Sequence, residues 1–288
     1  MRSPRKIAGS LYWGARKAWT RSIAGRAFRA AANPLWVARR FLRLVLHAQR
    51  NLAVGSLLDI GCGGKPYREL FNRVERYVGI DLPAPGCKAD AYADALRLPF
   101  ADASFDTVLC NQVLEHVPEP ARLMREAQRV LAPGGVLLLT TPQVWGLHHE
   151  PYDFFRYTRY GLKHLAEAQG LVVLAVTPTC GLWATLAQRL ADTAVHHYAA
   201  RTPIGFKQCV GLLTAPILLL GYSLDLLFGK HGDTLDNLLV ARKPSLLGAP
   251  APCRTTPTRS LAAKSSSPAA SGSSGRTWPA GSLPSAPA

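Results

Sequence analysis

The feature that most constrains the fold is an apolar run that ends in an acidic residue and a glycine turn, Leu57-Leu58-Asp59-Ile60-Gly61-Cys62-Gly63-Gly64. Such a run is typical of a buried parallel strand whose carboxyl end opens onto a ligand, because glycines let the backbone approach the ligand closely. About twenty residues later, Val78-Gly79-Ile80-Asp81 predicts a second strand that ends in a carboxylate. A carboxylate in that place can accept hydrogen bonds from both hydroxyls of a ribose. Together the two motifs predict a site for an adenosine-like group.

A dinucleotide cofactor does not fit the glycine turn. In the pattern G-x-G-x-x-G, the third glycine follows three positions after the second, and here that position is occupied by Pro66. This departure argues against a nicotinamide or flavin cofactor.

Further motifs follow in a fixed order. They are Asp94 before Leu98-Pro99-Phe100, Ser104-Phe105-Asp106-Thr107-Val108, Leu114-Glu115-His116-Val117 and Leu131-Ala132-Pro133-Gly134-Gly135. With the glycine turn and Gly79-Ile80-Asp81, this series resembles the class I S-adenosylmethionine-dependent methyltransferases, of the methyltransferase type 11-like kind. The resemblance covers roughly residues 55–180 and a strand near 235–243. It implies an enzyme whose cofactor is S-adenosylmethionine.

The resemblance also implies how the first part of the site contacts this cofactor. Asp59 would face the methionine amino group, and the backbone from Gly61 through Cys62 to Gly63 would pass beside the cofactor. We read Cys62 as a small packing residue and not as a nucleophile. Asp81, with Leu82 after it, would bind the ribose hydroxyls.

The later motifs complete the expected cofactor contacts. Asp94 would accept a hydrogen bond from the adenine amino group, and the backbone N–H of Ala95 would meet an adenine ring nitrogen. Asn111 and Gln112 follow the fourth strand, where the methyl end of the cofactor is expected.

The acceptor side rests on three candidate catalytic histidines, His116, His148 and His149. An imidazole titrates near neutral pH, so His116 could act as a base near the methyl group, or it could be a hydrogen-bonded residue at the start of a helix. His148 and His149 begin a polar and aromatic segment with the candidate substrate-binding residues Tyr152, Arg156 and Tyr157. This segment suits a sugar or another hydroxylated ring, and it resembles a bacterial methyltransferase subgroup associated with surface polysaccharide or lipid-linked glycan assembly. The alternative is structural: the two histidines satisfy loop backbone and Thr158 caps the following helix.

Strand and helix patterns alternate from residue 54, which predicts an α/β fold with a doubly wound, Rossmann-like sheet. We expect strands over 54–60, 77–81, 89–93, 105–111, 135–142 and 172–178, and helices from 65 to 73, 122 to 131 and 158 to 169. By resemblance, residues 234–242 form a last strand that is antiparallel to its neighbour. The domain so defined spans residues 51–243, with residues 181–233 as a hydrophobic helical insertion before the last strand.

The insertion contains the most lipid-like segment of the chain, Cys209 to Phe228. Pro216 and Asp225 interrupt it, and its uncharged part falls short of the roughly twenty residues that span a bilayer. We expect a helix pair embedded in a membrane surface. The alternative is a helical cap that folds over the active site and buries these leucines. The tail, residues 244–288, is rich in Ala, Ser, Pro and Gly and is expected to be disordered.

The charge of the chain lies in its extensions. Residues 1–50 contain twelve Lys or Arg and no Asp or Glu, whereas residues 51–243 contain eighteen of each sign. This basic amphipathic helical arm is interrupted at Asn33-Pro34. It suits an anionic membrane surface, and its alternatives are a helix that packs on the core and a transit peptide. Because the catalytic part is neutral, nucleic acid is an unlikely partner.

The six cysteines show neither a C-x-x-C pair nor metal-ligand spacing, so we expect a reducing compartment and no metal site. The sequence therefore predicts a cytoplasmic methyltransferase, peripheral at the inner face of the membrane, that methylates an oxygen of a glycan or lipid-linked acceptor. One alternative is a methyltransferase for a quinone, isoprenoid or other small molecule. Another is a catalytically inactive membrane scaffold, although a scaffold would not need the intact acidic residues and glycines.

Overall fold

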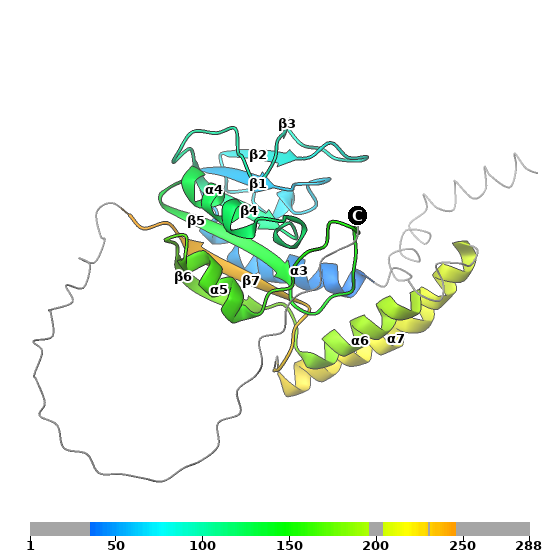
Figure 1. Cartoon of the computed structure of the whole chain (residues 1–288). Coiled ribbons are helices and arrows are strands. Elements are labelled where there is room, and N and C mark those ends of the chain that lie inside the picture. The colour runs from blue at the N-terminus through cyan, green and yellow to red at the C-terminus, as the bar shows by residue number, and fades with distance from the viewer. Residues whose placement is uncertain (1–34, 196–203, 230, 246–288) are drawn as a thin grey trace, which may run out of the picture. The chain divides into compact units, whose positions relative to one another are not determined.

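The computed structural model describes residues 35–195, 204–229 and 231–245 of the 288-residue chain. The expected disordered tail and the first part of the basic arm lie outside the described residues. Within the described part, a seven-stranded sheet has the order β3-β2-β1-β4-β5-β7-β6 (Figure 1). The strands are β1 (Ser56–Ile60), β2 (Arg76–Asp81), β3 (Ala91–Tyr92), β4 (Phe105–Asn111), β5 (Leu131–Pro142), β6 (Val172–Pro178) and β7 (Asp236–Arg242).

The sheet confirms the predicted fold class. Strands β1 to β5 pair in parallel, whereas β7 is antiparallel to both of its neighbours, β5 and β6. Strands β1 and β4 are adjacent, and the next strand after each lies toward the opposite edge of the sheet. The carboxyl ends of β1 and β4 therefore form the crevice where an open α/β sheet binds its ligand.

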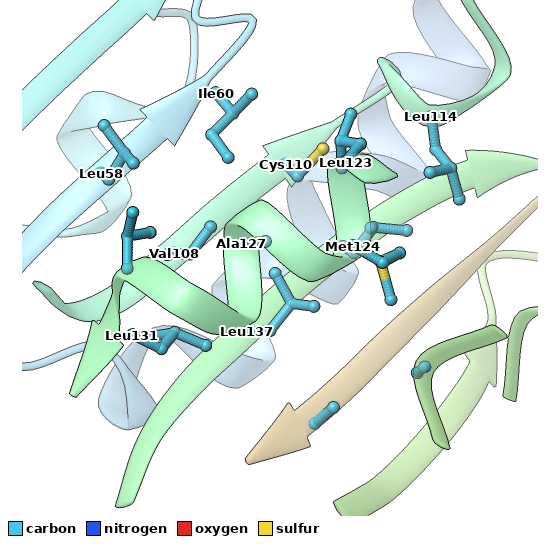
Figure 2. Packing of buried hydrophobic residues seen from close by; sticks show 14 of the residues in the cluster. Leu58, Ile60, Val108, Cys110, Leu114, Leu123, Met124, Ala127, Leu131 and Leu137 are labelled. Carbon is cyan, nitrogen blue, oxygen red and sulfur yellow. The ribbon is translucent and has the colours of Figure 1, made fainter. Parts of the chain in front are cut away.

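Helices cover both faces of the sheet. The described helices are α3 (Trp36–Gln49), α4 (Pro120–Val130), α5 (Arg159–Glu167), α6 (Leu182–Thr193) and α7 (Ile204–Phe228), with short 3₁₀ turns at Arg50–Leu52, Arg68–Leu70 and Leu114–His116. On one face, Leu123, Met124 and Ala127 of α4 pack on Leu58, Val108 and Leu137 of the strands (Figure 2). On the other face, Val45 and Leu46 of α3 pack on the sheet.

The helix predicted from residue 65 to 73 is wrong. Lys65 has a left-handed backbone with φ 56°, and Pro66 cannot donate a helical hydrogen bond. Only the 3₁₀ turn Arg68–Leu70 follows. The chain therefore leaves the glycine turn without a long helix over the crevice.

The second half of the basic arm packs on the core. In α3, Phe41, Val45 and Leu46 are buried, and Phe41 lies 5.6 Å from the ring of Tyr222 on α7. Residues 36–49 therefore form a helix that packs on the core, which is one of the two alternatives to membrane contact given for the arm. Only the residues before 35 remain for the expected contact with a membrane, and they lie outside the described part.

The insertion forms two helices, α6 and α7, that pack against each other (Figure 1). Gly221 of α7 makes the close approach possible, since a Cβ there would lie 2.6 Å from the Cβ of Ala187. Asp225 is buried and accepts hydrogen bonds from the backbone N–H groups of Gly181 and Trp183, at 2.6 and 3.1 Å. It therefore caps α6 and does not face lipid.

The outer face of α7 is apolar and exposed. Leu213, Leu220, Leu226 and Leu227 are 74%, 60%, 68% and 76% exposed. The cap alternative, in which these leucines are buried inside the protein, is contradicted. Within the described residues, one segment, Val210–Phe228, is long and apolar enough to cross a membrane by length and composition.

Candidate cofactor and acceptor site

Two glycines shape the turn after β1. Gly61 and Gly63 have left-handed backbones, with φ 69° and 50°. A Cβ on Gly61 would lie 2.2 Å from Cγ2 of Val113, so no larger residue fits there. A Cβ on Gly63 would have no described atom within 4 Å, because it would point into the open crevice. The turn thus leaves space for a ligand to lie against its backbone.

Asp81 is fixed at the end of β2 by two backbone groups. Its Oδ2 accepts a hydrogen bond from the N–H of Gly63 at 2.7 Å, and its Oδ1 accepts one from Leu82 at 2.8 Å. A carboxylate has about four acceptor positions, so two remain for the hydroxyls of a ribose. Asp94 is held similarly, because its Oδ1 accepts from the N–H of Leu96 at 2.8 Å.

A pocket of about 390 Å³ lies at this edge of the sheet, within the size range of small-molecule sites. The predicted residues that line it are Gly61, Gly63, Asp81, Leu82, Asp94, Ala95, Gln112, His116 and His149. Gln112 and His149 have left-handed backbones, with φ 56° and 54°. Such a conformation is unfavourable for residues other than glycine, and it clusters at functional sites.

Three predicted cofactor residues do not line this pocket. Asp59 is 4% exposed and accepts a hydrogen bond from the Tyr77 hydroxyl. Burial raises the pKa of Asp59 to about 7. Burial also raises the pKa of the Cys62 thiol to about 12, which fits the packing role expected for it. Asn111 accepts a hydrogen bond from Oγ1 of Thr140 at 2.6 Å, so its amide oxygen is engaged by β5.

The three candidate histidines lie together. The ring of His116 lies 4.8 Å from that of His148 and 5.3 Å from that of His149, and the rings of His148 and His149 are 5.6 Å apart. Burial lowers the pKa of His116. Glu115 lies beneath the cluster, fully buried, and burial raises its pKa to about 8. The sequence placed Glu115 in a motif without giving it a role.

The predicted substrate-binding residues hold the loop that carries the histidines. Arg156 donates two hydrogen bonds to the buried carboxylate of Asp153, at 2.6 and 2.7 Å, and one to the carbonyl of Gly146 at 2.9 Å. Hydrogen bonds from Arg156 lower the pKa of Asp153 to about 2. Tyr157 has a buried hydroxyl and packs on the core, whereas the Tyr152 side chain is 65% exposed. The structure thus gives Arg156 a positioning role that differs from the predicted one.

A second pocket, of about 210 Å³, shares Gln112, His116 and His149 with the first. Its other walls include Ala38 and Leu42 of α3, the indole of Trp145 and the buried carboxyl of Asp236. Burial raises the pKa of Asp236 to about 7. A third cavity, of about 600 Å³, continues from Trp145, His148 and His149 to Arg189 on α6. The histidines therefore lie between the expected cofactor pocket and a space that can hold an acceptor.

Sequence reasoning missed the walls of this second space. Ala38 and Leu42 belong to the basic arm, which carried no sign of contact with the site. Asp236 is the first residue of the last strand. Only its predicted place near the start of that strand could have suggested that it belongs to the site.

Comparison with known proteins agrees with this geometry. Residues 58–139 match the family described as methyltransferase domain. The chain is 35% identical over 111 residues to the ubiquinone biosynthesis O-methyltransferase of Psychrobacter cryohalolentis, a match that covers 33% of this chain and 43% of that protein. It is 40% identical over 100 residues to the 27-O-demethylrifamycin SV methyltransferase of Amycolatopsis mediterranei, with 29% of this chain and 37% of the relative covered. The chain thus spans less than half the length of these curated relatives.

Among solved structures, the chain is similar to phosphoethanolamine N-methyltransferase 2 of Haemonchus contortus in complex with S-adenosylmethionine. The TM-score is 0.48 and the identity 18%, with 80% of this chain and 60% of that chain covered. The family match, the glycine turn and the carboxylates at the ends of neighbouring strands agree: residues 58–139 match a methyltransferase domain, and S-adenosylmethionine is the cofactor that this match supports.

Proposed function

We propose that this chain transfers a methyl group to a hydroxyl on the ring of a lipid-soluble acceptor. The observation that carries the proposal is the second pocket, which shares a wall with the cofactor pocket and is lined by Ala38, Leu42 and Trp145. These side chains suit the faces of an apolar ring, and the buried carboxyl of Asp236 can accept a hydrogen bond from a ring hydroxyl.

The cofactor supplies a methyl group already activated on a sulfonium, so the chain has to position the acceptor and exclude water. With the cofactor bound, the acceptor oxygen would form a bond to the methyl carbon, the sulfur would keep the electron pair of the bond that breaks, and the hydroxyl proton would have to leave. His149 lines all three of these cavities and is placed to accept this proton, since an imidazole nitrogen with a lone pair can act as a base. Asp81, Asp94 and the glycine turn hold the cofactor in our account.

Two observations support a lipid-soluble acceptor. The third cavity runs from the histidines to Arg189 on α6, the helix that pairs with the exposed apolar helix α7. One relative is named for the O-methylation of ubiquinone biosynthesis. We therefore propose that α6 and α7 dock on an anionic membrane surface from which a quinone- or isoprenoid-like acceptor enters.

A lipid-linked glycan is the second candidate. Its support is the polar and aromatic segment 146–158, which the sequence assigned to a sugar. Arg156 is already paired with Asp153 and the Tyr157 hydroxyl is buried, so this segment offers few free polar groups to a sugar. We rank the ring acceptor first for that reason.

The test is a transfer assay with S-adenosylmethionine labelled in the methyl group. The acceptors are a prenylated dihydroxybenzene, the same ring without its prenyl tail, and an undecaprenyl-linked sugar, all offered in vesicles. We expect methyl ether formation on the prenylated ring and at least tenfold slower transfer to the ring without a tail. Transfer to the sugar alone would favour the second candidate, and methylation of nitrogen would contradict both.

A further inference from the structure

Glu115 is a buried carboxylate with an oxygen that no described group satisfies. The residue is 0% exposed. Its Oε2 accepts a hydrogen bond from Oγ1 of Thr141 at 3.3 Å, whereas Oε1 has no hydrogen-bond partner among the described residues. An unpaired buried carboxylate is costly, and a proton on Oε1 would itself need an acceptor. Among the described residues, Oε1 therefore lacks a group that would compensate for its burial, such as a hydrogen-bond partner or a cation.

Two histidines lie near this carboxylate, and hydrogen bonds at Nδ1 show which ring nitrogen of each keeps a lone pair. Nδ1 of His116 lies 2.6 Å from the carbonyl oxygen of Tyr152, and Nδ1 of His148 lies 3.0 Å from that of Gly146. A carbonyl can only accept, so each Nδ1 carries the hydrogen and each Nε2 keeps a lone pair. Metal-binding histidines are oriented in this way, with one ring nitrogen donating to a carbonyl or carboxylate and the other free for the ion.

The three side chains converge. Nε2 of His116 lies 3.8 Å from Oε1 of Glu115, too far for a hydrogen bond, and one ligand atom each from Glu115, His116 and His148 lie within 4.8 Å of one another. Ligands of one ion lie about 3 to 4 Å apart, given bonds of about 2.1 Å, so this group has to close by roughly an ångström. His148 lies on a loop and its side chain is 27% exposed, which leaves room for that movement.

We propose that Glu115, His116 and His148 bind a divalent transition-metal ion. Two imidazole nitrogens and one carboxylate oxygen are ligands that suit zinc, manganese or ferrous ions, and three protein ligands leave positions open. The cysteine spacing predicted no metal site. The proposed ligands are instead the adjacent pair Glu115 and His116, joined by His148 from a loop thirty-two residues after His116.

The role that we assign to this metal site in the reaction rests on the proposed function. His116 lines both the cofactor pocket and the second pocket, and His148 lines the second pocket and the third cavity. An ion between them would lie beside the hydroxyl of an acceptor. By binding that oxygen it would lower the pKa of the hydroxyl, and His149 would receive the released proton.

The test is the binding of Co²⁺, an optical probe for such sites, to the purified full-length protein without cofactor or acceptor. We expect one ion per chain and visible absorption bands typical of nitrogen and oxygen ligands. Glu115→Gln and His148→Gln should each weaken binding at least tenfold. Matched controls are Glu119→Gln and His164→Gln, which change an exposed carboxylate and an exposed imidazole and should bind as the wild type does.

Each outcome separates the metal site from the proposed function. Binding of S-adenosylmethionine by the variants shows that they are folded. No Co²⁺ binding by the wild type, or equal binding by His148→Gln, overturns the metal site. Co²⁺ binding with no transfer to any acceptor leaves the site intact and rejects the proposed function. Undiminished transfer by metal-free protein rejects the ion's role in the reaction.

Discussion

Gly63 is the residue whose missing side chain matters most for the cofactor. A Cβ there would have no atom of the described residues within 4 Å and would occupy the space of the pocket instead. We predict that Gly63→Ala weakens binding of S-adenosylmethionine at least tenfold and lowers the free energy of unfolding by about 1 kcal/mol, because alanine disfavours the left-handed backbone. Calorimetric titration and urea denaturation measure the two effects.

Gly170→Ala is the control for this change. Gly170 also has a left-handed backbone, with φ 75°, and no described atom within 4 Å of its Cβ position, but it lies at the end of α5. It should lose similar stability and keep full affinity for the cofactor. Equal affinity loss in both variants would show that strain, and not the pocket, controls binding.

Asp59 is expected to make stability depend on pH. Its pKa is raised from 3.8 to about 7 by burial, so between these values the folded protein keeps a proton that the unfolded chain has lost. The free energy of unfolding then falls as pH rises through this window, by up to about 1.4 kcal/mol per pH unit for one group. Asp59→Asn keeps the shape of the side chain but has no titrating proton. The fall of the free energy of unfolding with pH should therefore lose the contribution of this one group. Urea denaturation across the window measures it, and parallel curves for the two proteins would contradict the assignment.

At the scale of elements, the capping of α6 by Asp225 is the contact that joins the two inserted helices. Its carboxylate accepts from the backbone N–H groups of Gly181 and Trp183. We predict that Asp225→Ala destabilises α6 by about 1 to 3 kcal/mol, since two N–H groups at the start of the helix, one of them buried, lose their acceptor. Hydrogen exchange of residues 182–193 should quicken. Ser223→Ala, which removes an exposed hydroxyl from α7, should leave exchange unchanged.

The strands could be predicted because each is a short apolar run next to glycine, proline or an acid. The strand Val172–Pro178 has the predicted bounds, and the last strand is antiparallel as the resemblance implied. The helix predicted after the glycine turn was wrong, because apolar spacing said nothing of the left-handed backbone at Lys65. Local backbone geometry of this kind is set by contacts that only the folded chain makes.

For the same reason, some residues of the candidate site could be predicted from the sequence and others could not. Asp81 and Asp94 could be found because they end strands or follow them, and strand ends meet at one edge of the sheet. The second pocket could not be predicted, because Ala38, Trp145 and Asp236 come from three distant segments. The clamp between Arg156 and Asp153 was also missed, since a pair of charges in a loop looks the same whether it binds a ligand or holds the loop.

At the scale of the whole molecule, the proposed docking on a membrane would depend on the exposed face of α7. Leu220 and Leu227 are 60% and 76% exposed on this helix. We predict that the double change Leu220→Glu with Leu227→Glu reduces sedimentation with anionic vesicles at least tenfold, because two charges would have to enter the interface.

Leu44→Glu with Val54→Glu is the matched control, since these residues are 42% and 54% exposed on other surfaces of the protein. It should bind vesicles as the wild type does. If the α7 variant still binds, deletion of residues 1–34, which contain eight of the twelve basic residues of the arm, shows whether charge alone holds the protein there. Binding that depends only on those charges would contradict docking by α7.

The most direct measurement is calorimetric titration of the wild type and of Asp81→Ala with S-adenosylmethionine, with NAD as the control ligand. We predict micromolar binding of S-adenosylmethionine by the wild type, no binding of NAD, and an affinity for S-adenosylmethionine at least tenfold weaker in the variant. That loss corresponds to about 1.4 kcal/mol, because the ribose hydroxyls lose a charged acceptor. Equal affinity of the two proteins, or failure of the folded wild type to bind, would contradict the cofactor site.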